Sequence, residues 1–71
     1  MNIEQYITVD KDIAGGTPVF KGTRVAVKTL FDYLEEDSIE AFLIGFPSVT
    51  RQQAEVIIEL AVAKLLSEIA A

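Results

Sequence analysis

Apolar residues recur at helical spacing from about residue 27 onward. The first stripe has the spacing i, i+3, i+4, i+7, and it consists of Val27, Leu30, Phe31 and Leu34. The charged residues between them fall on the opposite face of the same helix. This pattern predicts a first helix over residues 27–36.

A second, shorter apolar stripe follows a polar break, and it consists of Ile39, Phe42, Leu43 and Phe46. Asp37 and Glu40 have the spacing of a capping box, with Asp in place of the usual Ser or Thr, so we expect Asp37 to start this helix. We expect Gly45 to end it, because the left-handed backbone after a helix is nearly free of strain only without a Cβ. Pro47 prevents continuation.

The third predicted helix is the longest, and it is apolar on more than one side. Thr50 and Gln53 form a capping box before it, and no helix breaker occurs from Arg51 to about Ile69. One apolar face holds Ala54, Ile57, Ile58, Ala61 and Leu65. A helix that is apolar nearly all round must be buried on both sides, which this short chain cannot provide. We therefore predict a homodimer whose interface is the second apolar face, Val56, Leu60, Ala63, Leu66 and Ile69.

The first 26 residues have extended character. A β-prone segment covers residues 3–9, and residues 18–20 and 24–27 flank Lys21-Gly22-Thr23, which is short enough to be a tight turn. Pro18 makes a central strand improbable, so we expect edge strands or a β-hairpin. The sequence predicts a mainly α fold in a single domain, residues 1–71. An extended or β arm over 1–26 precedes a three-helix, helix-turn-helix core over 27–71.

Composition excludes several kinds of chemistry. The chain has no Cys and no His, so it has no disulfide framework, no zinc motif of those residues and no Ser-His or Cys-His pair. The acidic residues from Glu35 to Glu40 do not have the spacing of a calcium loop. We therefore expect a protein that is not an enzyme, with no metal, no cofactor and no small-molecule substrate.

Size and hydropathy give three further expectations. A chain of 71 residues buries only roughly 60% of its unfolded surface, so a content of 51% hydrophobic residues favours a core shared with a second chain. The residues after Met1 do not resemble a secretory signal. The most apolar stretch, residues 56–66, is too short to span a bilayer. We expect a soluble cytoplasmic protein without a membrane partner.

The net charge of −5 is unevenly distributed. Residues 1–28 carry four basic and three acidic residues, a net charge of +1, whereas residues 29–71 carry two basic and eight acidic residues, a net charge of −6. A general nucleic-acid binder would be basic. Any anion-binding surface must therefore draw mainly on the first part of the chain.

Operator DNA is nevertheless a candidate partner, because a helix-turn-helix places the start of its second helix in the major groove. Arg51, Gln52 and Gln53 are suited to base edges, and Lys21, Arg24 and Lys28 to phosphates, so the candidate DNA-binding residues are Lys21, Arg24, Lys28, Arg51, Gln52 and Gln53. Two alternatives remain open. The third helix can belong to a simple bundle in which its polar start is solvated. The three basic residues can form a solvated edge, or Arg24 can pair with Glu35, Glu36 and Asp37.

Two motifs resemble those of a known prokaryotic family. They are the GGTPVFKGTR run of residues 15–24 and the FPSVT run of residues 46–50. In this they are similar to the family called domain of unknown function 433, which consists of small antitoxin-like proteins. The resemblance implies a homeodomain-like or winged-helix-like core. The motif positions are Gly15, Gly16, Pro18, Gly22, Thr23, Arg24, Phe46, Pro47 and Thr50, and of these Arg24 alone carries chemistry suited to a partner.

The resemblance also implies a function. Such a protein would neutralise a PIN-like ribonuclease toxin by direct binding and would repress its own operon by binding DNA. Two other hypotheses are a stand-alone dimeric helix-turn-helix transcription regulator, and a structural or interaction module without a toxin partner. The chain lacks glycine between its first two predicted helices and stops soon after the third, so a toxin would have to be bound by the folded surface.

Overall fold

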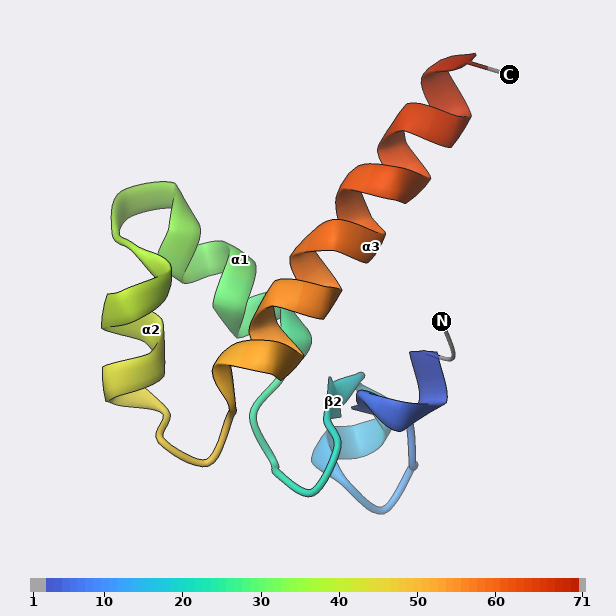
Figure 1. Cartoon of the computed structure of the whole chain (residues 1–71). Coiled ribbons are helices and arrows are strands. Elements are labelled where there is room, and N and C mark those ends of the chain that lie inside the picture. Colours follow the sequence, from blue (N-terminus) through green and yellow to red (C-terminus); the bar gives the residue numbers. More distant parts are fainter. Residues whose placement is uncertain (1–2, 71) are drawn as a thin grey trace.

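The computed structural model describes residues 3–70 and is mainly helical, as predicted (Figure 1). Three helices form the larger part: α1 (Val27–Glu36), α2 (Ile39–Gly45) and α3 (Arg51–Ala70). Before them come two short 3₁₀ turns, η1 (Ile3–Gln5) and η2 (Ala14–Gly16), and two strands, β1 (Ile7–Thr8) and β2 (Val19–Phe20). In Figure 1, α1 and α2 lie on one side of the first turns of α3, and the N-terminal segments lie at its base. No helix within residues 3–70 has the length and hydropathy needed to cross a membrane.

The two strands pair with each other in antiparallel register, Ile7 opposite Phe20 and Thr8 opposite Val19. The two arms predicted around residues 21–23 also pair, through a single bridge between Val19 and Ala26. The β-prone segment is shorter than expected, because residues 3–5 form a 3₁₀ turn instead. The N-terminal arm is thus a small hairpin-like unit attached to the helices.

The core lies where β2 meets the three helices. Its buried residues are Phe20, Leu30, Phe42, Val49, Ala54 and Ile57. Phe42 of α2 packs against Phe20 of β2, with ring centroids 6.0 Å apart, and against Phe46 at 5.1 Å and Tyr33 at 5.8 Å. This aromatic cluster joins the N-terminal arm to the helices, and it fixes the surfaces described below.

The predicted capping box of α3 is confirmed, while that of α2 is wrong by one residue. Thr50 Oγ1 accepts from the Gln53 backbone N–H at 3.1 Å, and Gln53 Oε1 accepts from the Thr50 N–H at 2.9 Å. At α2 the cap is Ser38, whose Oγ accepts from the Ala41 N–H at 3.1 Å. Asp37 instead ends α1, and its Oδ1 accepts from the Ser38 N–H.

Gly45 was expected to follow α2 with a left-handed backbone, and this is wrong. Gly45 is the last helical residue, and it is not among the residues with positive φ. A Cβ at this position would lie 3.3 Å from the Tyr33 hydroxyl oxygen. The glycine therefore leaves room for the Tyr33 hydroxyl, which would have to shift by a few tenths of an ångström if a Cβ were present.

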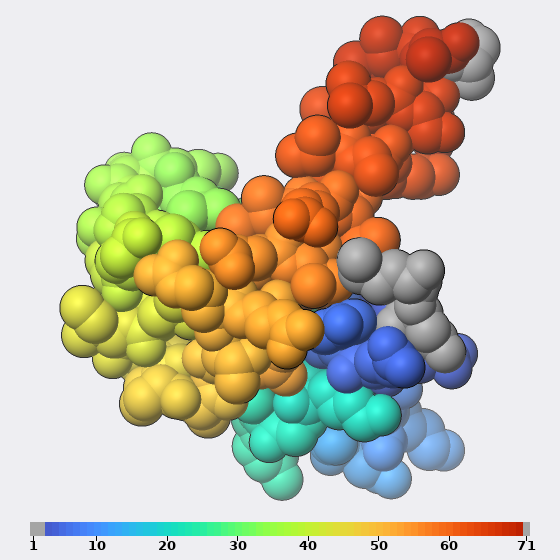
Figure 2. Space-filling view, viewed as in Figure 1, coloured from blue at the N-terminus to red at the C-terminus, as the bar shows by residue number. Residues whose placement is uncertain are grey.

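The long helix α3 changes environment along its length. In its first two turns Ala54, Val56 and Ile57 are buried. Residues 61–70 are all exposed, and Figure 2 shows this part of the helix projecting from the body of the molecule. The prediction that Val56 lies at a dimer interface is therefore wrong, because residues of the same chain already bury its side chain.

Candidate interaction surfaces

The motif residues Gly22, Thr23 and Arg24 form a turn beside a surface hollow of about 530 Å³. Gly22 has a φ of +80°, and a Cβ there would have open space around it, so the backbone conformation explains the glycine. The Thr23 hydroxyl donates to the Phe20 carbonyl at 2.8 Å and accepts from the Val25 N–H at 3.0 Å. The hollow is lined by Thr8, Ile13, Gly22, Thr23, Arg24, Val25 and Ser48.

The basic residues of this region differ in their partners. Lys28 pairs with Asp32 at 2.8 Å, and its pKa is raised by that hydrogen bond and by the carboxylate's charge. Lys21 Nζ donates to the Glu4 carbonyl at 3.3 Å. Arg24 is exposed and makes no hydrogen bond or ion pair with any other residue in the range 3–70. The alternative in which Arg24 pairs with Glu35, Glu36 and Asp37 is thus not observed in this range.

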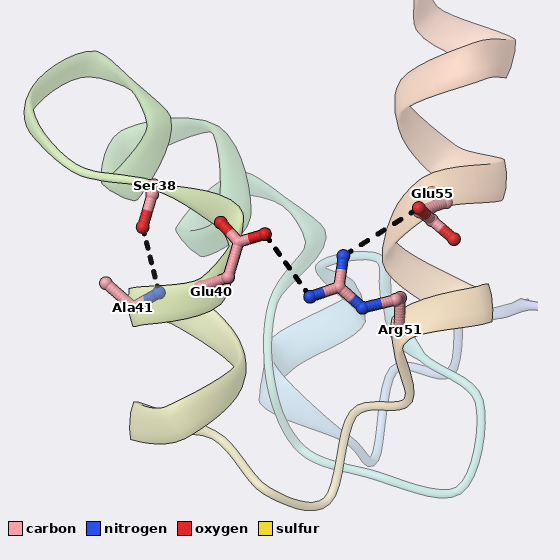
Figure 3. A network of polar contacts seen from close by, with 5 residues as sticks. All are labelled: Ser38, Glu40, Ala41, Arg51 and Glu55. Atoms are coloured by element: carbon pink, nitrogen blue, oxygen red, sulfur yellow. Dashed lines mark hydrogen bonds and ion pairs between the residues drawn. The ribbon is translucent and has the colours of Figure 1, made fainter.

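Acidic residues surround Arg51 at the start of α3. Figure 3 shows its guanidinium between Glu40 of α2, at 3.3 Å, and Glu55 one turn further along α3, at 3.8 Å. The pKa of Glu40 is lowered, first by a hydrogen bond from its own backbone N–H and then by the side chain of Arg51. The charge most suited to a base edge is therefore already opposed by two carboxylates.

The two glutamines that follow Arg51, Gln52 and Gln53, differ in their exposure and in their hydrogen bonds. Gln52 is exposed, whereas the Gln53 amide is engaged within the chain: its oxygen accepts from the Thr50 N–H and its nitrogen donates to the Lys21 carbonyl at 3.0 Å. This second bond joins the Lys21 turn to the start of α3. The structure thus gives Gln53 a structural role, and DNA binding by the six candidate residues stays a prediction.

A cluster of carboxylates lies at the C-terminal end of α1. We call Asp32, Glu35, Glu36 and Asp37 the acidic corner, and all four are exposed. Asp32 forms an ion pair with Lys28 and Asp37 accepts from the Ser38 N–H, but the side chain of Glu36 has no hydrogen bond or ion pair with any residue from 3 to 70. A shallow hollow of about 290 Å³ is lined by Asp32, Tyr33, Glu36 and Asp37. Within the described residues no group of acidic side chains is arranged to hold a metal ion.

The acidic corner has an unfavourable position in its helix. The C-terminal end of a helix carries a partial negative charge, so carboxylates there are destabilising and basic residues are stabilising. The last turn of α1 contains no basic residue and ends in Glu35 and Glu36. The stability of the helix does not explain these charges, which makes them candidates for a binding role.

The end of α3 is the second unexplained surface. Its large apolar side chains keep half or more of their surface exposed: Val62 50%, Leu65 60%, Leu66 59% and Ile69 72%. Leu66 and Ile69 were predicted at an interface, whereas Leu65 was assigned to the other apolar face and Val62 was not among the predicted interface residues; all four lie in the same exposed segment of α3. Helical periodicity places residues on a face, but it does not say where along the helix the body of the protein ends.

The two motifs, residues 15–24 and 46–50, lie within the part of the chain that a family model matches. The family described as "Protein of unknown function (DUF433)" matches residues 7–61. The chain belongs to this DUF433 family. No curated protein and no solved structure matches the chain. The DUF433 match includes the Arg24 turn and the acidic corner, and it ends just before the exposed stripe of α3.

Proposed function

We propose that this DUF433 protein is a non-enzymatic antitoxin that neutralises a PIN-like ribonuclease by binding it directly. The exposed carboxylates of the acidic corner carry this proposal, above all Glu36, whose side chain has no ion pair with any residue from 3 to 70. They are costly where they lie, since they oppose the dipole of α1. A partner with a basic surface would remove that cost on binding.

The charge distribution supports a protein partner more than a nucleic acid. The acidic corner belongs to the segment 29–71, which carries a net charge of −6. A nuclease must attract RNA, so its substrate path is expected to be basic. Opposite charges on two surfaces speed their encounter and fix their relative orientation. An acidic protein that covers such a path would prevent RNA from entering it.

A charge reversal at Glu36 tests this function. The test uses the product of the adjacent gene, which this proposal expects to be a PIN-like ribonuclease, and measures its cleavage of a fluorescent RNA against rising concentrations of the chain. The native chain is expected to abolish cleavage at a fixed stoichiometry. Glu36→Lys replaces attraction by repulsion, and it is expected to weaken inhibition about tenfold or more at low salt, with a smaller effect at high salt.

Asp12→Lys is the matched control, because it makes the same change of charge at an exposed residue in the segment between β1 and η2. It is expected to inhibit nearly as well as the native chain. Equal weakening by both variants would mean that net charge matters and the acidic corner does not. Cleavage that is unaffected by the native chain would overturn the antitoxin role.

Operator binding is the second candidate, and the arrangement of α2, a short connection and α3 favours it. Arg51 and Gln52 are exposed at the start of α3, but Glu40 and Glu55 beside them would face phosphates. The test is a gel shift with the protein's own promoter at low salt. A shift that Arg51→Ala removes would support operator binding, and no shift at low salt would exclude it.

A further inference from the structure

The last ten helical residues of α3 leave the body of the protein without other chain around them. Residues 61–70 are all exposed, and Figure 1 shows this part of the helix extending away from the other elements. Isolated helical turns are only marginally stable in water, and most helical stability in proteins comes from packing of an apolar face. A projecting helix end that keeps four large apolar side chains therefore needs a surface to pack against.

The spacing of these side chains is that of a coiled coil. Val62, Leu65 and Ile69 follow each other at intervals of three and four residues, so they occupy positions a, d and a of a heptad. Val or Ile at a together with Leu at d is the combination that favours two parallel strands. Ile58 continues the stripe at the preceding d position, where it already packs partly on the core.

The charges of this segment lie outside the stripe. Lys64 and Glu68 pair with each other at 2.8 Å on the same helix. In a parallel pair, Ala61 at position g of one copy lies opposite Leu66 at position e of the other, and neither residue is charged; Glu68 also occupies a g position, but the e position that would lie opposite it falls outside the 71 residues. A second copy therefore presents no repulsion here, and a charged partner would find no opposite charge on the stripe.

We propose that residues 61–70 of α3 pair with the same segment of a second copy, as a short parallel two-stranded coil. The contact surface is small: four side chains, half to three-quarters exposed in one copy, offer on the order of 250 Å² of apolar area per copy. Stable interfaces begin at roughly 1,200 Å² in total, so the dimer is weak and reversible. This dimer does not depend on the antitoxin role, because the acidic corner takes no part in it.

Light scattering of the chain alone, over a range of concentrations, tests the dimer. The mass is expected to rise from that of one copy to that of two, and added salt is expected to leave the rise unchanged or to strengthen it, since each copy carries a net charge of −5. Leu65→Glu puts a charge into the stripe and is expected to weaken association at least tenfold. Ser67→Glu is the matched control on the outer face of the same turn, and it is expected to dimerise like the native chain.

Leu65 is exposed in the single chain, so Leu65→Glu is expected to fold, and circular dichroism checks this. A native chain that stays monomeric at millimolar concentration would overturn the proposal. So would a dimer that both variants weaken equally, or a dimer that neither variant affects.

Cysteine cross-linking tests the parallel register, and the chain has no native cysteine to interfere. Ile69→Cys places two thiols opposite each other in a parallel pair, and a disulfide-linked dimer is expected to form under mild oxidation. Ser67→Cys, on the outer face of the helix, is expected to give much less disulfide-linked dimer. Equal yields from the two variants, or no product from Ile69→Cys, would contradict the parallel coil.

Discussion

Replacing Glu36 by Lys is expected to stabilise the fold while it weakens partner binding. Glu36 ends α1 and has no ion pair with the described residues, and Asp32 lies one turn before it. Removing a carboxylate from the negative end of the helix is worth about 0.3–1 kcal/mol. In the native chain Asp32 and Glu36 form a like-charge pair four residues apart, and in the variant Asp32 and the introduced lysine carry opposite charges. This change stabilises the helix by a few tenths of a kcal/mol more. The sum is about 1 kcal/mol, which corresponds to a rise of about 4–8 °C in Tm for a domain of this size.

The assay is thermal unfolding followed by circular dichroism at 222 nm, at one protein concentration and in low and high salt. Glu36→Gln separates the two contributions, and it should give about half of the rise. Salt should reduce the gain, because the effect is one of exposed charges. A lower Tm for Glu36→Lys would refute the reasoning, since it would mean that the carboxylate stabilises the native chain.

Three further predictions concern the fold and the start of α3. Phe42→Leu should lower the free energy of unfolding by about 1 kcal/mol and Phe42→Ala by about 3–5 kcal/mol, as measured by urea unfolding, because the ring is fully buried against Phe20 and would leave a cavity. Gly22→Ala should lower the free energy of unfolding by about 1–2 kcal/mol and Gly22→Asn by clearly less, because the positive φ is the sole source of strain at this position. Equal losses for the two variants would mean that lack of space, and not the backbone conformation, requires the glycine. The Glu40 carboxyl should titrate by NMR below its usual pKa, and Arg51→Gln should raise this pKa only partly, because the backbone hydrogen bond remains. A carboxyl with a lowered pKa stabilises the fold above its unfolded pKa, so this contribution should be lost as the pH falls through the folded value.

Local sequence signals predicted the helices well. The stripe from Val27 gave the exact bounds of α1, and the Thr50–Gln53 box marked the start of α3. Both signals act within one or two turns of the chain, so no tertiary contact was needed to interpret them. Ser38 was missed as a cap because Asp37 beside it suits the same chemistry and has an acid, Glu40, three residues on, whereas Ser38 has Ala41 at that spacing.

The predictions were wrong where contacts between distant parts of the chain determine the environment of a residue. Gly45 accommodates the Tyr33 hydroxyl across two helices, a contact without a local signal. Val56 and Leu65 are both apolar residues of one helix, yet one is buried and the other is exposed, because the body of the protein ends between them. Periodicity also could not show that Gln53 would be engaged at the Lys21 turn. The surplus of apolar residues was visible in the sequence, but its place on α3 was not.

The most direct test of the central claim is size-exclusion chromatography with light scattering, applied to the chain after co-expression with the product of the adjacent gene, which the proposed function expects to be a PIN-like ribonuclease. The predicted result is one peak that contains both proteins and has no ribonuclease activity, and Glu36→Lys should divide it into two peaks at moderate salt. Two separate peaks for the native chain, with the ribonuclease fully active, would contradict the account.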